Sequence, residues 1–267
     1  MRVRRIHTAM TVLLASSLLA LTACGAGSEG TDATSEAGSV GVSGPLTVFA
    51  AASLTESFTQ LGKDFEAINP GTEVTFSFAG SSALATQINQ GAPVDVFAAA
   101  APANMKTVTD AGNAGGGPTT FARNQLVIAV AAGNPRGITG LSDLVDPGLK
   151  VALCAEQVPC GAAARKVLGT ATVELTPVTF EPDVKSALSK VRLGEVDAAL
   201  VYRTDANAAR ADVTGVEFPE SASAVNDYPI VVLKDAPNRR AAAAFVAYVL
   251  AGPARSVLTQ AGFHVPG

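Results

Sequence analysis

The sequence predicts an α/β protein in which strands and helices alternate along the chain. Short apolar segments typical of buried strands are repeatedly followed by stretches whose apolar residues recur every three or four positions. The 267 residues are 48% hydrophobic and 16% charged, which is typical of a folded chain with a large core. This alternation favours mainly parallel sheets covered by helices.

The first half of the chain shows the alternation most clearly. A helix is expected over 54–68, because its apolar residues from Leu54 to Ile68 are separated by steps of four and three, and Asn69-Pro70-Gly71 ends it. Strands are expected over 46–50, 74–78 and 94–98, and further helices over 82–90 and 102–111. The glycine-rich segment 112–118 is expected to be a loop.

The second half continues the same pattern. Strands are expected over 126–131, 150–153, 198–202 and 230–233, and helices over 141–144, 161–168, 183–193, 241–250 and 254–260. Pro182 stands in the first-turn region of the helix over 183–193, where its missing N–H costs least. The periodicity does not decide between one doubly wound sheet and two smaller sheets.

Charge and composition exclude several function classes. The net charge is −4 and there are no basic blocks, so nucleic acid is not expected as a partner. The chain has two histidines, His7 and His264, and three cysteines, so His-rich metal sites and zinc frameworks are excluded. A catalytic Ser/His or Cys/His arrangement would depend on His264, which is expected to be a surface residue near the C-terminus.

The N-terminus has the features of a secretory signal. Arg2, Arg4 and Arg5 precede an apolar run over 10–21 that is too short to span a membrane. The following Leu21-Thr22-Ala23-Cys24 resembles a bacterial lipobox, and a Gly/Ser-rich stretch follows it. We therefore expect residues 1–23 to be a signal peptide and residues 24–44 to be a tether with a lipidated Cys24. A plain signal with an incidental cysteine is the alternative.

Four helix starts follow strands in a way that is typical of ligand sites. Ser53 follows the first strand and forms an S-x-x-E pattern with Glu56, which predicts a capping box. Ser81 has the same position after the second strand. The segments 158–161 and 181–184 lead into two further helices. Each start offers unpaired backbone N–H groups and a partial positive charge.

Several converging helix starts form an anion site without Lys or Arg, and the crevice beyond the strand ends is the usual ligand position in open α/β sheets. Tyr202, at the end of the strand over 198–202, adds a hydroxyl. The alternative is that each helix start serves ordinary capping and that Tyr202 is a half-buried strand residue. An enzyme with Ser53 or Ser81 as nucleophile is disfavoured, because no base is placed beside either serine by local spacing, and a purely structural lipoprotein would not need convergent helix starts.

Several segments of the chain have a characteristic sequence, and the two most specific are Val48–Thr55 and Phe78–Ile88. The others, in chain order, are Gly91–Phe97, Val158–Gly161, Asp183–Leu188, Gly194–Ala198, Leu200–Tyr202, Leu250–Ala254 and Gly262–Phe263. Together they cover about residues 46–264, which is essentially the whole predicted domain. In these segments the chain resembles the molybdate-binding proteins of bacterial ABC importers.

This resemblance implies a two-domain periplasmic-binding-protein fold of type II, with the ligand in the cleft between the domains. Domain I would comprise residues 45–125 plus 229–267, and domain II residues 126–228. The implied molybdate contacts are the hydroxyl and backbone N–H of Ser53 and Ser81, the backbone N–H of Cys160 and Val184, and the Tyr202 hydroxyl. The family pattern commonly has Ala at the position of Cys160, and Ala100-Ala101-Pro102 lacks an acidic residue often found there.

The resemblance also implies a monomeric, extracytoplasmic, non-enzymatic protein, held at the cell membrane by a lipid anchor and working with a membrane ABC permease, with no cofactor.

Molybdate and tungstate are dianions with acceptor oxygens only, which suits a set of seven neutral donors. Hydrogen phosphate would leave its O–H unpaired in such a site. Sulfate or another small oxyanion remains the alternative ligand. Lys185 and Arg203 adjoin contact residues and are expected to be solvated surface charges, with long-range attraction of the anion as the alternative.

Cys154 and Cys160 are expected to form a disulfide. Lipidation would use Cys24 and leave these two cysteines, six positions apart, in an oxidising compartment. Two free buried thiols are the alternative.

Overall fold

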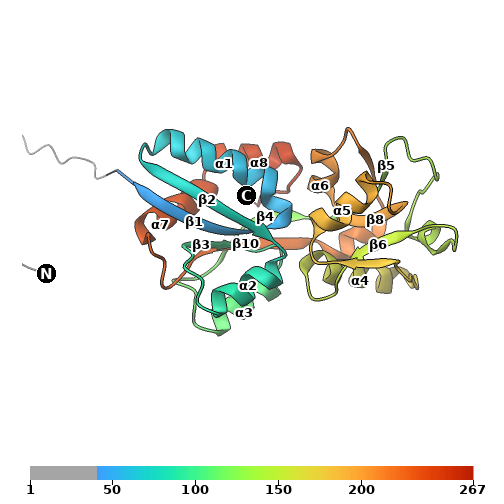
Figure 1. Ribbon diagram of the computed structural model, residues 1–267, viewed down its shortest axis with the longest axis horizontal. Helices are drawn as coiled ribbons and strands as arrows, with labels where there is room; N and C mark the ends of the chain where they lie inside the picture. Colours follow the sequence, from blue (N-terminus) through green and yellow to red (C-terminus); the bar gives the residue numbers. More distant parts are fainter. Residues whose placement is uncertain (1–40, 267) are drawn as a thin grey trace, which may run out of the picture. The chain divides into compact units, whose positions relative to one another are not determined.

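The computed structural model describes residues 41–266, which form two five-stranded sheets with helices packed against them (Figure 1). The predicted signal peptide and the lipidation site at Cys24 lie outside these residues. Sheet I, in the order β2–β1–β3–β10–β4, contains β1 (Gly44–Ala51), β2 (Thr72–Ala79), β3 (Val96–Ala98), β4 (Thr119–Asn124) and β10 (Asn226–Val232). Sheet II, in the order β7–β6–β8–β5–β9, contains β5 (Leu126–Ala131), β6 (Val151–Cys154), β7 (Thr179–Glu181), β8 (Ala198–Tyr202) and β9 (Val213–Val216).

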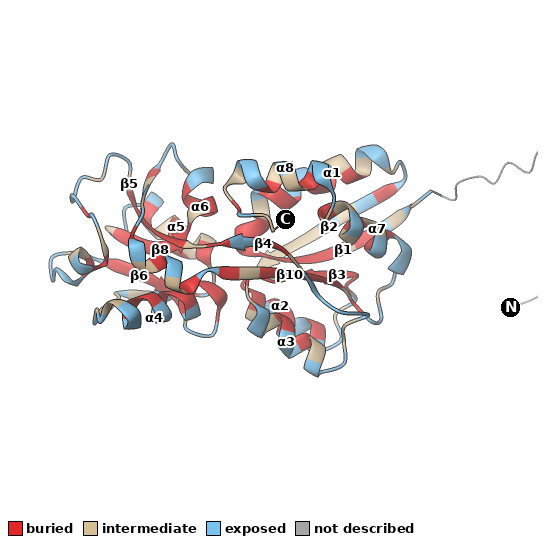
Figure 2. Ribbon diagram, turned by 180° about the vertical axis from the view of Figure 1, so that it is seen from behind, coloured by how far each residue is buried: buried red, intermediate tan, exposed pale blue. Residues whose placement is uncertain are grey.

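Sheet I has a separate apolar core on each face, and we call this sheet with its helices lobe I. The pleat of β1 directs Leu46, Val48 and Ala50 into the core that includes α1 (Thr55–Ile68), α7 (Arg239–Val249) and α8 (Gly252–Ala261). Phe49 points to the other face, where α2 (Ser81–Asn89) and α3 (Pro102–Asp110) pack. In Figure 2 the strands are largely buried and the outer helix faces are exposed.

Sheet II and its helices form lobe II, which has one continuous core. Its helices are α4 (Pro159–Ala171), α5 (Val184–Arg192) and α6 (Arg203–Ala208), and it also contains the short 3-10 helices η2 (Leu141–Val145) and η3 (Pro219–Ala224). The chain enters lobe II between β4 and β5 and returns to lobe I between η3 and β10. At the first crossing, the Asn124 side chain donates a 2.8 Å hydrogen bond to the Thr204 hydroxyl.

The seven predicted strands and all the predicted helices are present, but the prediction of mainly parallel sheets is wrong. Each sheet is mixed: β1 pairs parallel with β2 and β3, and β6 pairs parallel with β7 and β8, whereas β10 and β5 pair antiparallel with both of their neighbours. The reason is topological, since β5 and β10 are the strands that directly follow the two crossings between lobes. The sequence analysis also missed β4, β7, β9 and α6.

Within residues 41–266, no single helix combines the length and the apolar composition needed to cross a bilayer; α7 and α8, bent by 61° at the break between them, satisfy both criteria as a pair.

Candidate functional site

One small cavity is lined by all five residues that the sequence analysis selected as ligand contacts. Ser53 and Ser81 come from lobe I, and Cys160, Val184 and Tyr202 come from lobe II. Its volume is about 10 Å³. A space of this size is about the minimum that holds one water, so a larger ligand requires the lining residues to move apart.

Three of the residues that line this cavity lie at helix starts. Ser81 is the first residue of α2, Cys160 the second of α4 and Val184 the first of α5. In α4 the hydrogen bond from Ala162 N to Val158 O, at 3.0 Å, belongs to the first helical turn. The N–H of Cys160 precedes it and has no acceptor within the helix. The same holds for the first residues of α2 and α5, so these groups are available to an anion.

The two serine hydroxyls are held by further residues of lobe I. Ser81 Oγ accepts a hydrogen bond from Ala100 N at 3.0 Å, which leaves its own proton to donate. Ser53 Oγ lies 2.9 Å from the hydroxyl of Tyr228 in β10. Burial raises the pKa of Tyr228 well above its ordinary value, so this phenol stays protonated and can donate to Ser53. Sequence reasoning missed Tyr228, which lies 175 positions from Ser53.

The predicted capping box at Ser53 and Glu56 is not formed. Ser53 lies inside the 3-10 helix η1 (Ala52–Leu54), and α1 starts after Leu54 without a side-chain cap. The Glu56 carboxylate instead accepts hydrogen bonds from Lys185 Nζ, because α1 and α5 meet at this point. The Ser53 hydroxyl is therefore free of a capping role and is available at the cavity.

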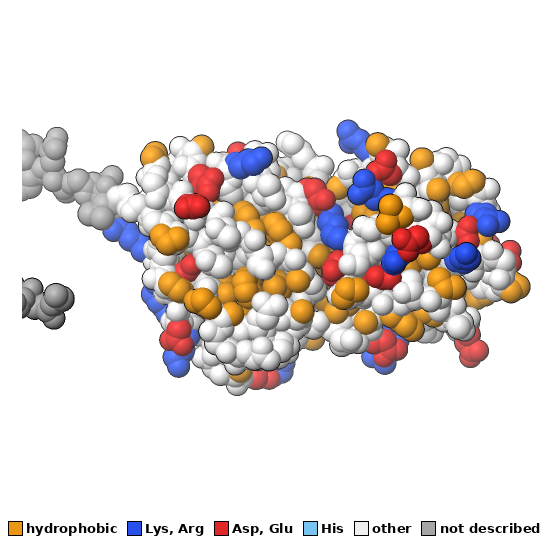
Figure 3. Space-filling view, in the orientation of Figure 1, with side chains coloured by type: hydrophobic (Ala, Val, Ile, Leu, Met, Phe, Trp, Pro, Cys, Tyr) orange, Lys and Arg blue, Asp and Glu red, His pale blue; other side chains and the backbone are white. Residues whose placement is uncertain are grey.

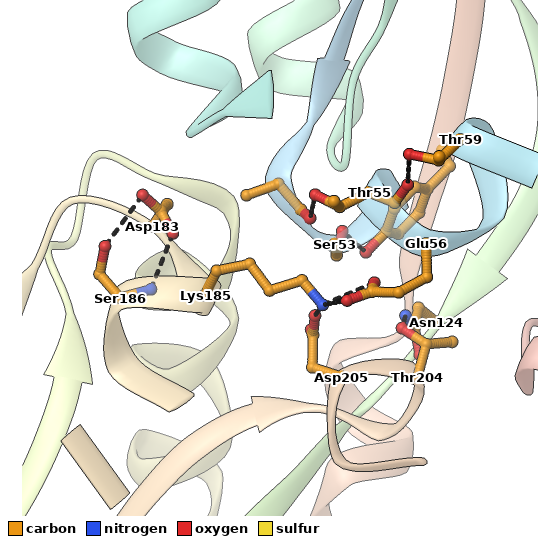
Figure 4. A network of polar contacts seen from close by, with 12 residues as sticks. Ser53, Thr55, Glu56, Thr59, Asn124, Asp183, Lys185, Ser186, Thr204 and Asp205 are labelled. Carbon is orange, nitrogen blue, oxygen red and sulfur yellow. Dashed lines mark hydrogen bonds and ion pairs between the residues drawn. The ribbon is translucent and has the colours of Figure 1, made fainter. Parts of the chain in front are cut away.

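Asp183 lines the cavity but does not present a free carboxylate to it. It is the N-cap of α5, and its side chain accepts hydrogen bonds from Ser186 N at 2.9 Å and Ser186 Oγ at 3.1 Å (Figure 4). Pro182 therefore precedes the cap and does not lie in the first turn as the sequence suggested. With its carboxylate engaged in this way, Asp183 leaves the hydroxyls of Ser53, Ser81 and Tyr202 as the other polar side-chain groups that line the cavity.

The Tyr202 hydroxyl is the most informative atom of the cavity. Tyr202 ends β8 and is 1% exposed, yet its hydroxyl makes no hydrogen bond of normal geometry with any residue of the described chain. Burial, with smaller contributions from Tyr228 and Asp205, raises the pKa of Tyr202 well above its ordinary value against a smaller opposing effect of Asn226, so the group is a neutral donor. A buried hydroxyl that interacts only imperfectly with its neighbours, here Tyr228 and Asn226, costs free energy, which a ligand acceptor at this position would recover.

The loop that presents Cys160 is tied at both ends. Cys154, at the end of β6, and Cys160 are joined as a disulfide with Cα atoms 5.7 Å apart. Gly161 is required beside it, because a Cβ there would lie 1.9 Å from the carbonyl oxygen of Ala155. The turn from β6 into α4 thus has little freedom, which fixes the direction of the Cys160 N–H.

Replacing Cys154 and Cys160 together by Ala should lower the free energy of unfolding by about 2 kcal/mol, since the bridge closes a short loop of the unfolded chain. Urea unfolding of the oxidised protein and of the double variant measures this difference. Affinity for the ligand should change little, because Cys160 contributes a backbone N–H. Two free thiols at these positions in the unreduced, denatured protein would contradict the bridge.

Lys185 and Arg203 are both ion-paired, and the expectation of a solvated surface charge is wrong for Lys185, which pairs with the buried Asp205. Lys185 Nζ lies 2.8 Å from Asp205 Oδ1 and 2.7 Å from Glu56 Oε2, whereas Arg203 pairs with Glu217 at 2.7 Å. Burial alone would lower the pKa of Lys185, but Asp205 and Glu56 together outweigh it and raise the pKa. The Lys185 charge is therefore compensated by the Asp205 and Glu56 carboxylates, and the proposed donors in the cavity are neutral groups.

Asp205 should make the folded state less stable as pH rises. Burial raises its pKa from 3.8 to about 6, although Lys185 opposes the shift. Between these two values the folded state holds the proton and the unfolded state does not, so the stability contributed by Asp205 falls by about 2 kcal/mol from pH 4 to pH 7. Urea unfolding of the protein and of Asp205→Asn across this range measures it. The difference in the free energy of unfolding between the natural protein and Asp205→Asn should shrink by about 2 kcal/mol as pH rises. A difference that stays constant with pH would contradict a raised pKa of Asp205.

The described residues provide no metal site, and the Ser53 and Ser81 hydroxyls make their hydrogen bonds with Tyr228 and Ala100. Within residues 41–266 there is no group of three or more His, Cys, Asp or Glu side chains that could hold a metal ion. His264 is exposed, as expected, and pairs through its backbone with Arg123. Acidic and basic side chains are interspersed on the face drawn in Figure 3, without a region of one sign.

Two lobes with a small donor-lined cavity between them are typical of proteins that capture a solute. Residues 46–264 match the model of the bacterial extracellular solute-binding proteins, and the chain belongs to this family. It is 48% identical over 257 residues to the molybdate-binding protein ModA of Mycobacterium tuberculosis, a match that covers 96% of this chain and 97% of that protein.

Two solved structures share the fold. The periplasmic molybdate-binding protein of Azotobacter vinelandii matches with a TM-score of 0.69 at 23% identity, over 83% of this chain and 100% of its own. The sulfate-binding protein SubI of Mycobacterium tuberculosis also has a TM-score of 0.69, at 21% identity, over 83% of this chain and 86% of its own. These likenesses confirm the two-domain α/β fold and do not distinguish between ligands.

Proposed function

We propose that this protein captures molybdate, and tungstate with it, outside the cytoplasm for an ABC importer in the membrane. The observation that carries the proposal is that one cavity is lined by the buried Tyr202 hydroxyl, which makes no hydrogen bond of normal geometry within the described chain, and by Ser53, Ser81 and two helix starts. A tetrahedral dianion offers acceptors to all of these groups at once. The 48% identity to a protein named as molybdate-binding favours this ligand over other oxyanions.

The proposed contacts are seven neutral donors. Ser53 and Ser81 each give a hydroxyl and an N–H, Cys160 and Val184 each give an N–H, and Tyr202 gives its hydroxyl. The helix dipoles supply a fixed positive potential without a counter-ion, so neutral groups suffice for a dianion. Because an acceptor is missing from this set, hydrogen phosphate would bury an unpaired O–H and bind weakly.

Calorimetry on the purified protein with molybdate, tungstate, sulfate and phosphate tests the proposal. We expect one molybdate or tungstate per chain, with sulfate and phosphate much weaker. Sulfate has the same charge and shape but is smaller, so it would leave some donors out of reach. Tighter binding of sulfate than of molybdate would make the protein a sulfate binder, and no binding of any of the four would refute an oxyanion function.

Tyr202→Phe should weaken molybdate binding by roughly 10- to 150-fold, the loss expected for one hydrogen bond to a charged group. Without ligand, the variant should be about as stable as the natural protein, because the deleted hydroxyl makes no hydrogen bond of normal geometry within the described chain. Calorimetry and thermal unfolding measure the two effects. Equal affinity for molybdate in both proteins would remove Tyr202 from the site.

The remaining features of the proposal follow from this role. The protein would be a monomer without enzymatic activity or a cofactor, anchored to the cell membrane through a lipidated Cys24 after removal of residues 1–23. Domain I would comprise residues 45–125 plus 229–267 and domain II residues 126–228, and closure of the two would enclose the anion. The permease would receive the anion when the domains separate.

A further inference from the structure

Three charged side chains meet beside the cavity (Figure 4). Lys185 Nζ lies 2.7 Å from both carboxylate oxygens of Glu56 and 2.8 Å from Asp205 Oδ1. The Asp205 side chain is completely buried, that of Lys185 is 24% exposed and that of Glu56 is 53% exposed. The lysine thus bridges one buried and one partly exposed carboxylate.

Each of the three residues follows a proposed contact residue by one to three positions. Glu56 is three residues after Ser53, Lys185 is next to Val184, and Asp205 is three residues after Tyr202. The cluster therefore connects the chain segments that carry three of the five contacts. A shift of any one of these segments would move both a ligand donor and a charge of the cluster.

The two ion pairs differ in where their partners lie. Lys185 and Asp205 both belong to lobe II, through α5 and α6, and their contact survives any movement of the lobes as rigid bodies. Glu56 belongs to α1 in lobe I, so its contact with Lys185 exists only while the lobes are together. Asp205 holds the Lys185 side chain in place, and the ion pair between Lys185 and Glu56 forms when the lobes close.

We propose that Lys185, Glu56 and Asp205 form a latch that holds the two lobes closed and slows release of the bound anion. Lys185 is a positioning residue here, because its ammonium group is engaged by two carboxylates and its effect on the ligand passes through lobe closure. The effect on release rests on the proposed molybdate function, whereas the effect on closure does not depend on it.

The latch is tested by the rate of molybdate release, followed by tyrosine fluorescence after mixing the loaded protein with excess tungstate. Glu56→Gln should release molybdate about two- to fivefold faster, the effect of one partly exposed ion pair, with a smaller change in the association rate. In a background that carries both Lys185→Met and Asp205→Asn, the same Glu56→Gln change should have no effect. An equal acceleration in both backgrounds, or none in the natural protein, would overturn the latch.

Glu195→Gln is the matched control. Glu195 is 49% exposed and pairs with Lys190 at 2.6 Å, but both residues lie in lobe II. The substitution changes the same charge on a pair that does not span the lobes, so the release rate should stay unchanged. Acceleration equal to that of Glu56→Gln would mean that net charge, and not the bridge between lobes, controls release.

Small-angle X-ray scattering of the ligand-free proteins separates the latch from the proposed ligand. Glu56→Gln should increase the radius of gyration relative to the natural protein, and high salt should remove the difference, because screening weakens the ion pair. If this increase appears but no molybdate binds, the latch stands and the proposed function fails. If molybdate binds but Glu56→Gln alters neither scattering nor release, the latch fails and the function stands.

Discussion

Ser53→Ala and Ser81→Ala should each weaken molybdate binding by roughly 10- to 150-fold, because each deletes a hydroxyl bonded to a charged ligand. The Ser81 hydroxyl accepts from Ala100 N–H, and Ser53 lies 2.9 Å from the Tyr228 hydroxyl. In each case the serine oxygen can act as an acceptor toward its neighbour while its proton is directed to the anion. Both residues are buried, so water cannot easily replace the lost donor.

Calorimetric titration of both variants with molybdate gives the affinities, and Val184→Ala serves as the control. Val184 contributes only a backbone N–H to the proposed site, so its truncation should leave the affinity nearly unchanged. If the two serine variants bind as tightly as the natural protein, the proposed donor set is wrong.

Gly80→Ala should weaken molybdate binding by about 5- to 150-fold although Gly80 donates nothing to the ligand, because overpacking typically costs 1–3 kcal/mol. Its φ of −58° and ψ of 133° suit any residue, so the glycine is not required by its backbone conformation. A Cβ at this position would instead lie 2.6 Å from the carbonyl oxygen of Pro182 and 3.3 Å from Val158, both in lobe II. The methyl group should therefore oppose closure and leave lobe I intact.

Affinity and ligand-free stability together test this explanation. Gly80→Ala should bind more weakly but unfold at the same temperature as the natural protein in the absence of ligand. Gly116→Ala is the matched control, since no atom lies within 4 Å of a Cβ placed there. Loss of ligand-free stability comparable to the loss of affinity would mean that Gly80 serves the fold and not closure.

Local patterns predicted most of the helices and strands, and the residues proposed as ligand contacts line one cavity. The spacing of apolar residues in α1 and the apolar runs of β1, β5 and β8 are properties of short segments, and so is a serine or a capping turn at a helix start. Because the carboxyl ends of neighbouring strands meet at one edge of a sheet, residues such as Ser53 and Ser81 come together once the strand order is set. The resemblance supplied the particular choice of Cys160, Val184 and Tyr202.

Contacts between distant segments could not be predicted in this way. Glu56 fitted a capping box with Ser53, but it pairs with Lys185, which lies 129 positions away and in the other lobe. Tyr228 contacts Ser53, and Gly80 lies close to Pro182 and Val158, only because distant segments meet in the folded chain. The antiparallel insertion of β5 and β10 depends on where the chain crosses between lobes, and the periodicity of a strand carries no information about its direction.

The central claim is that one tetrahedral oxyanion is held between the lobes by neutral donors of this chain. A crystal structure of the protein grown with molybdate, with molybdenum located by its anomalous scattering, tests it most directly. We predict one metal centre per chain, its oxygens within hydrogen-bond distance of the Ser53, Ser81 and Tyr202 hydroxyls and of the N–H groups of Cys160 and Val184. Molybdenum located away from this cavity, or an oxyanion bound by the ammonium group of Lys185 in place of these donors, would contradict the claim.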